Sequence, residues 1–176
     1  MKKFIFIIAL PLLILPGLAQ SRNCLRILPI AELTRSSTLI ARAKVHKVGK
    51  ATYRGAYNQL AILKLVDVIE GDFTLKQVNV LARSNVPCAE DNYIEEQEML
   101  VFLEPAESLF HTANYQYGQF LIVGETVKGW RDKNNNPIDK PYAEVRQEIE
   151  AYVNAIHSPP SENQQEKKPN QPPPLD

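Results

Sequence analysis

The chain has 176 residues with 20 basic and 20 acidic side chains, and 44% of its residues are hydrophobic. Balanced charge argues against a dedicated nucleic-acid-binding protein, because such proteins carry a strong basic excess. A chain of this length can bury enough apolar surface to fold as one domain without metals or many disulfides.

Residues 1–19 have the pattern of a secretory signal peptide. A lysine pair precedes an apolar stretch at residues 4–15, and the small residues Gly17 and Ala19 predict cleavage before Gln20. The apolar stretch has twelve residues, whereas a spanning helix needs about 20, so an uncleaved membrane anchor is the weaker alternative. We therefore expect an exported chain, periplasmic or extracellular, without a membrane span after cleavage.

Residues 158–176 contain six prolines and no aromatic side chain, which predicts a disordered tail. The folded domain is then expected at residues 20–157, as a monomer. Removing the signal takes away two lysines and no acid, so 18 basic and 20 acidic side chains remain, a net charge of −2.

The predicted elements begin with a short helix at residues 28–33. Strand patterns then follow at residues 38–48, 57–72, 77–82, 99–103 and 118–123. The second of these is almost unbroken apolar from Leu60 to Ile69, which predicts a central strand that is buried on both faces.

Residues 126–138 predict a hairpin over a polar turn at residues 132–137. Asp132, Asn134 and Asn136 have the spacing of the first ligands of a calcium loop, but proline follows where that loop needs glycine, so we interpret the segment as a plain turn. Asp139 is the predicted cap of an amphipathic helix that ends near Ile156.

Five short strands with a helix at each end predict an all-β fold. The expected architecture is a five-stranded barrel of the oligonucleotide/oligosaccharide-binding (OB) type, with a short N-terminal helix and a C-terminal amphipathic helix. A two-sheet sandwich is the competing arrangement.

Cys24 and Cys88 are the chain's two cysteines, and export places them where thiols oxidise. One pairing is available to them, and a bridge between them stabilises the fold by about 4 kcal/mol in the loop-entropy model. Two unpaired buried thiols are the alternative.

Catalytic and metal-binding patterns have little support. The chain has three histidines and lacks the G-x-S-x-G, H-E-x-x-H and glycine-rich phosphate-loop motifs. We therefore expect a protein that is not an enzyme and that needs no cofactor or metal.

A basic strand face offers one candidate binding surface. Its members lie on or just beyond the first strand: Arg42, Lys44, His46 and Lys50. Such a face can hold an anionic glycan or another polyanion, and the alternative is a strand face that simply stays solvated. An acidic run at residues 90–98 is expected to stay solvated as well.

The order of several motifs resembles that of a known family. A cysteine near the mature N-terminus is followed by Ser37 to Val45, by a long apolar strand closing on Val68-Ile69-Glu70-Gly71, by Val86-Pro87-Cys88-Ala89 and by Met99 to Leu103. Over about residues 24–123 this order is similar to the N-terminal domain of tissue inhibitors of metalloproteinases and to the related netrin modules.

The resemblance implies a five-stranded barrel with a bridge between Cys24 and Cys88. It also implies a partner-binding ridge made of Cys24, Leu25, Val86, Pro87 and Cys88, which in the inhibitors enters the protease cleft. There the free amine of the first cysteine chelates the catalytic zinc, whereas cleavage before Gln20 leaves four residues in front of Cys24. We expect a secreted, non-catalytic protein-binding domain whose partner is a metalloproteinase or another extracytoplasmic protein.

Overall fold

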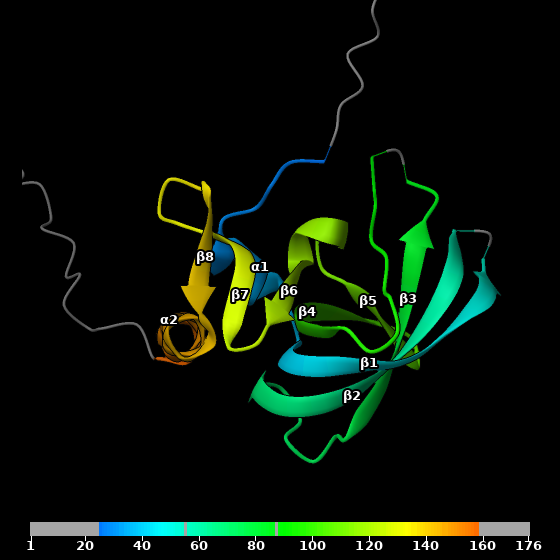
Figure 1. Cartoon of the computed structure of the whole chain (residues 1–176), viewed down its shortest axis with the longest axis horizontal. Helices are drawn as coiled ribbons and strands as arrows, with labels where there is room; N and C mark the ends of the chain where they lie inside the picture. The colour runs from blue at the N-terminus through cyan, green and yellow to red at the C-terminus, as the bar shows by residue number, and fades with distance from the viewer. Residues whose placement is uncertain (1–24, 55, 87, 159–176) are drawn as a thin grey trace, which may run out of the picture.

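A computed structural model describes residues 25–54, 56–86 and 88–158 (Figure 1). Residues 1–19, Cys24 and the predicted tail beyond residue 158 lie outside these ranges, so the signal, the bridge and the tail stay predictions. Among the described residues, no helix is both long and apolar enough to cross a membrane.

Strands make up half of the described residues, with a helix near each end. The elements in chain order are α1 (Ile30–Ser36), β1 (Leu39–Tyr53), β2 (Tyr57–Glu70), β3 (Gln77–Ser84), β4 (Glu98–Ala106), β5 (Leu109–Thr112), the 3-10 helix η1 (Tyr115–Gly118), β6 (Gln119–Val123), β7 (Thr126–Arg131), β8 (Pro137–Pro141) and α2 (Tyr142–His157).

Five strands close into a ring. They pair in the order β1-β2-β3-β5-β4, and β4 pairs back to β1. Within the ring β3 and β5 run parallel, and the other neighbours run antiparallel. The fold is therefore an OB-like barrel, which confirms the predicted class and excludes the two-sheet sandwich.

The strand that completes the ring is not the predicted one. Residues 118–123 were expected to supply the fifth strand, whereas β5 takes that place. Both β5 and β6 pair with the same edge of β4, β6 with residues 98–101 and β5 with residues 103–106. β6 then leads into the β7–β8 hairpin, which lies with α2 to one side of the ring (Figure 1).

The strand that is buried on both faces is β4 rather than β2. Residues 99–103 of β4 are all buried, because alternate side chains enter two different cores. Val101 and Leu103 fill the barrel, whereas Leu100 and Phe102 pack beneath the helices. In β2 the barrel-facing positions are buried, but Val66 is exposed, so the prediction that β2 is buried on both faces was wrong.

The outer core joins the two helices to strands β4, β6 and β7. Trp130 on β7 packs between Phe102 and Phe120, with ring centroids 6.3 and 5.0 Å away. Val145 and Ile149 of α2 are buried in the same cluster, which confirms the amphipathic helix.

The predicted cap of α2 was wrong, whereas the predicted hairpin before the helix is present. Asp139 does not cap α2, since it lies in β8 and accepts hydrogen bonds from Lys128 Nζ and Gly129 N; Pro141 holds the cap position. The β7–β8 hairpin is confirmed, and Asp132 Oδ1 accepts hydrogen bonds from two backbone amides of its own turn.

Candidate functional site: a ridge at one end of the barrel

The segment before α1 is held against β7 by a buried arginine of that strand. Arg131 donates hydrogen bonds to the main-chain oxygens of Leu28 and Tyr117. Its guanidinium lies 5.2 Å from the Phe120 ring centroid, and burial lowers its pKa. Since a buried guanidinium is costly to leave unpaired, these contacts hold the main chain at Leu28 in place.

A short turn links this segment to the β3–β4 loop. Asn114 Nδ2 donates to Arg26 O at 3.1 Å, and Gln116 Nε2 donates to Cys88 O at 2.8 Å. The Glu90 amide donates in turn to Gln116 Oε1 at 2.9 Å. The β5–η1 turn and the start of η1 therefore hold the N-terminal segment and the loop at the same end of the molecule (Figure 1). We call residues 25–28 together with 85–86 and 88–92 the ridge.

The described part of the predicted ridge lies here. Val86 is 37% exposed, and Leu25 and Cys88 are half-buried. Cys24 and Pro87 lie outside the described residues, so the bridge to Cys88 stays a prediction.

Sequence reasoning did not identify Asn114, Gln116 or Arg131 as ridge supports. An asparagine and a glutamine in a turn show no periodicity. An arginine near a hairpin turn is ordinarily interpreted as a solvated side chain. The position of Arg131 directly after the chain's single tryptophan is the one hint that it enters the core.

The loop rests on a rigid base inside the barrel. Gln59 Nε2 donates to Asn92 Oδ1 at 3.0 Å, and the Tyr93 amide donates to Gln59 Oε1 at 3.0 Å. The Tyr93 ring is buried, its hydroxyl lies 2.7 Å from Thr112 Oγ1, and burial raises its pKa. These contacts fasten residues 92 and 93, at the end of the ridge, to the barrel.

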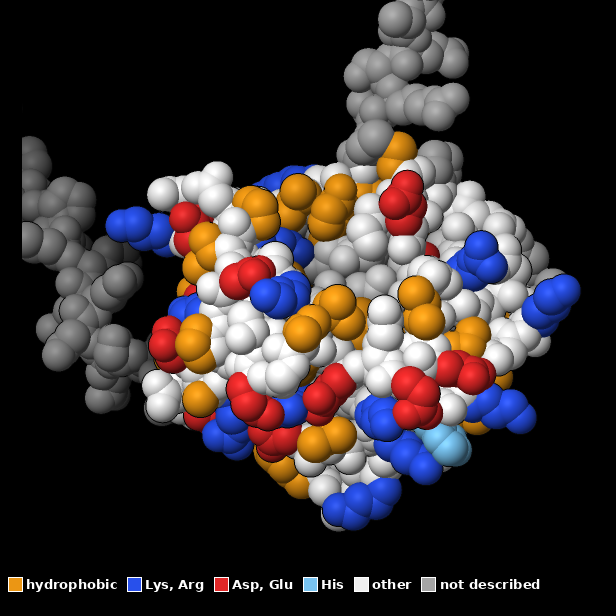
Figure 2. All heavy atoms as spheres, viewed as in Figure 1, with side chains coloured by type: hydrophobic (Ala, Val, Ile, Leu, Met, Phe, Trp, Pro, Cys, Tyr) orange, Lys and Arg blue, Asp and Glu red, His pale blue; other side chains and the backbone are white. Residues whose placement is uncertain are grey.

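Two hollows adjoin the ridge. One, of about 320 Å³, is lined by Ile27 and Gln116 together with residues of η1, β6 and β7. The other, of about 410 Å³, lies beside the loop and is lined by Asp91 and Glu90 among others. Figure 2 shows apolar side chains gathered around a depression in the upper part of the face in view.

Two of the four members of the basic strand face are paired with carboxylates. Arg42 lies 2.6 Å from Glu98 and 2.9 Å from Glu125, and Lys44 lies 2.6 Å from Glu96. Hydrogen bonding to the Glu96 carboxylate raises the pKa of Lys44. The acidic run supplies two of these partners, which the sequence alone did not indicate. Glu90, Glu95 and Glu96 are exposed, but the expectation that the whole run stays solvated was wrong for Asp91, which is 1% exposed and accepts a hydrogen bond from the Ser84 amide.

The remaining two members of that face, His46 and Lys50, are exposed. Along a strand Lys44 and Lys50 are about 20 Å apart, so the four side chains do not converge on one small ligand. Figure 2 shows acidic side chains bordering the basic ones over β1 and β2.

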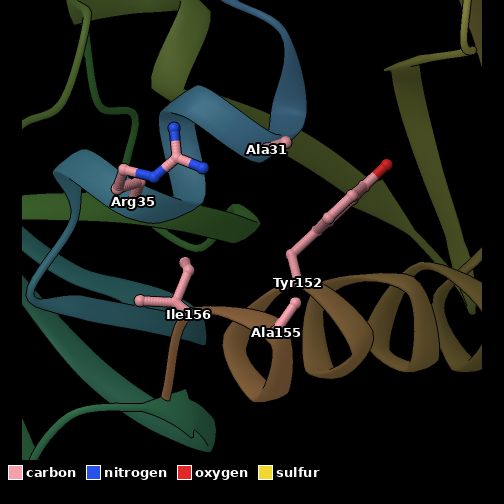
Figure 3. A pocket seen from close by; sticks show the side chains of 5 residues that line it. All are labelled: Ala31, Arg35, Tyr152, Ala155 and Ile156. Atoms are coloured by element: carbon pink, nitrogen blue, oxygen red, sulfur yellow. The ribbon is translucent and has the colours of Figure 1, made fainter. Parts of the chain in front are cut away.

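A further hollow of about 320 Å³ separates α1 from α2 (Figure 3). Its walls come from Ala31 and Arg35 of α1 and from Tyr152, Ala155 and Ile156 of α2. It has one charged side chain and no arrangement that favours a particular ligand.

Within the described ranges, no group of three or more His, Cys, Asp or Glu side chains is placed to hold a metal ion. A scan against protein-family models gives no match for this chain. A search of the curated proteins gives no match either. The family resemblance therefore stands on the residues quoted above.

Proposed function

We propose that the chain is an exported, non-catalytic domain that binds a protein partner through the ridge. The observation that carries this proposal is the bonding of Asn114 to Arg26 and of Gln116 to Cys88, which holds two distant segments at one end of the barrel. In the family that the sequence resembles, the corresponding segments form the edge that enters a protease cleft.

The partner class that this resemblance favours is a zinc endopeptidase. Ile27 and Val86 give the ridge exposed apolar side chains, and burying such groups is the main driving force of protein association. The residues in front of Cys24 argue for cleft filling without chelation of zinc by a terminal amine.

The test is inhibition of a panel of zinc endopeptidases by the exported, purified protein. Its N-terminus should first be read by mass spectrometry, and Gln20 is the expected first residue. We expect inhibition of at least one member at micromolar protein, and no inhibition of any member overturns the inhibitor assignment.

A matched pair of variants locates the surface. Ile27→Asp on the ridge should weaken inhibition by at least about tenfold, because it places a charge in a desolvated contact. Ile156→Asp on the last turn of α2 changes an equally exposed isoleucine, 40% against 38%, and should leave inhibition unchanged. An equal effect of both variants contradicts binding through the ridge.

A further inference from the structure

The end of the barrel opposite to the ridge carries the two most exposed large hydrophobic side chains among the described residues. Phe73 is 64% exposed, and Val66 is 59% exposed. Val66 lies at a bulge of β2, and Phe73 lies in the turn that joins β2 to β3. Figure 1 shows this turn at the bottom of the view and the ridge segments toward the top.

Hydrogen bonds order this turn while Phe73 stays exposed. Asp72 Oδ1 accepts hydrogen bonds from the Thr74 amide at 2.8 Å and from the Thr74 hydroxyl at 2.6 Å. The Leu75 amide donates to Asp72 O at 3.2 Å, and the Leu75 side chain packs against the core of the barrel. The residues on either side of Phe73 are therefore held in the turn, and Phe73 is presented at its tip.

Lysine side chains adjoin the turn on the outer surface of the barrel. Lys44 and Lys64 are cross-strand partners, and Lys47 pairs with the residue of β2 that lies two positions before Lys64. The main-chain oxygen of Lys76 accepts a hydrogen bond from the amide that follows Lys64. All four lysines are exposed, and neighbouring strands lie about 4.8 Å apart, so their ammonium groups share one area of the surface.

This area, which we call the turn surface, consists of four lysines and two apolar residues: Lys44, Lys47, Lys64, Lys76, Val66 and Phe73. Three of the lysines have no carboxylate within ion-pair distance among the described residues, and the fourth, Lys44, is paired with Glu96. The two acids of β2, Asp67 and Glu70, are paired with side chains of α2 instead. Figure 2 shows basic and apolar side chains together at the lower edge of the face in view.

We infer that the turn surface attaches this domain to a bilayer that contains anionic lipids. Phe73 and Val66 enter the boundary between headgroups and acyl chains, where aromatic side chains are favoured, and the lysine ammonium groups bind lipid phosphates. An anionic glycan can pair with the lysines but gives Phe73 no apolar surroundings, so the exposed phenyl ring favours a bilayer.

A bilayer also suits the layout of the charges. The lysines are spread over two strands and a turn and do not converge on one small ligand, whereas a bilayer presents phosphates over a broad plane. The ridge lies at the other end of the barrel and stays accessible when the turn surface is attached (Figure 1). The inference therefore goes beyond the proposed function and does not depend on it.

The test is sedimentation of the full exported chain with vesicles. One set of vesicles is phosphatidylcholine alone, and the other contains about 30% phosphatidylglycerol. We expect binding to the anionic vesicles at least about tenfold stronger than to the neutral ones, and a loss of most of this binding at about 0.5 M salt.

Two matched comparisons assign the binding to the turn surface. Phe73→Ser should weaken the partitioning to anionic vesicles by at least about tenfold, because it removes a phenyl ring that is buried in the bilayer. Val86→Ser, at the ridge end, should leave the partitioning unchanged. An unchanged fluorescence of the buried Trp130 shows that each variant is folded.

The second comparison keeps the net charge equal. The double variant Lys64→Gln/Lys76→Gln should weaken the partitioning by at least about tenfold. The double variant Lys50→Gln/Lys133→Gln removes two exposed lysines elsewhere and should change it by less than about twofold.

The inference is overturned if the wild type does not bind anionic vesicles, if it binds neutral vesicles equally well, or if the two double variants behave alike. Salt-sensitive binding that Phe73→Ser leaves unchanged shows a surface for polyanions in general and also overturns it. None of these results bears on inhibition of a proteinase, which is measured without vesicles.

Discussion

Asp91 shows at the scale of one residue how burial in this fold shifts the pKa of a side chain. Burial raises its pKa, with the Ser84 hydrogen bond acting in the opposite direction. For an acid, a raised pKa in the folded state means that the charged form is the less stable one. Its contribution to folding is most favourable below the unfolded pKa, near about 4, and is lost as pH rises through the folded pKa.

We therefore expect Asp91→Asn to have a higher free energy of unfolding than the wild type at pH 8, with the gain shrinking toward pH 4. Burial raises the pKa of Tyr57 and Tyr93, so both stay protonated across this range. The comparison is made in a His111→Asn background, because the charge of His111 acts on the Asp91 pKa. Urea denaturation of both proteins across this range measures the difference in the free energy of unfolding. A difference that does not change with pH contradicts the raised pKa.

Arg131 is the second residue of interest, because it holds the N-terminal segment of the ridge against the barrel. Arg131→Met keeps most of the apolar length but leaves the main-chain oxygens of Leu28 and Tyr117 without their donor. We expect a loss of about 1.5–3 kcal/mol in the free energy of unfolding, the range for hydrogen bonds to charged groups. Lys133→Met, at an exposed position of the same hairpin, should change stability by less than about 0.5 kcal/mol.

At the scale of elements, α2 is fastened to the barrel through one aspartate of β2. Asp67 Oδ2 accepts hydrogen bonds from Tyr142 Oη at 2.7 Å and from Arg146 Nε at 3.0 Å. Asp67→Ala should cost about 1–3 kcal/mol and should lower hydrogen-exchange protection in α2 before the barrel strands. The exposed pair of Glu107 with Arg54 is the control, and Glu107→Ala should cost at most about 1 kcal/mol.

β4 offers a second test at this scale, because its two faces enter different cores. Phe102→Ala should cost about 3–5 kcal/mol and shift the fluorescence of Trp130, which stacks on Phe102 and is the only tryptophan. Leu103→Ala should cost about 2–5 kcal/mol with little change in the native fluorescence, since Leu103 faces the barrel interior. Equal fluorescence changes contradict the separation into two cores.

For the whole molecule, the sequence predicts the class of fold better than the order in which the strands pair. Alternating and apolar runs locate most strands, and the amphipathic spacing of Val145 and Ile149 locates α2. β5 escapes detection because its four residues are too short to show a period, and its pairing depends on β3 and β4. β2 was mistaken for the strand buried on both faces because hydrophobicity alone cannot show which side chains a neighbouring layer covers.

The candidate site was likewise predicted only in part. The ridge segments were predicted from motif order, and the described residues among them do lie at one end of the barrel. Their supports, Asn114, Gln116 and Arg131, depend on contacts between distant parts of the chain, which no local pattern encodes. The burial of Asp91 could not be predicted from the sequence either, because there Asp91 is simply one member of an acidic run.

The central claim is that the ridge is the binding surface of this domain, and a pair of substitutions at opposite ends of β3 tests it most directly. Val86 lies in the loop that follows β3, and Phe73, 64% exposed, lies in the turn that precedes it. The measurement is the inhibition constant of Val86→Asp and Phe73→Asp against a zinc endopeptidase that the wild type inhibits. The account predicts at least about a tenfold loss for Val86→Asp and no change for Phe73→Asp; unchanged inhibition by Val86→Asp, or no inhibition by the wild type, contradicts it.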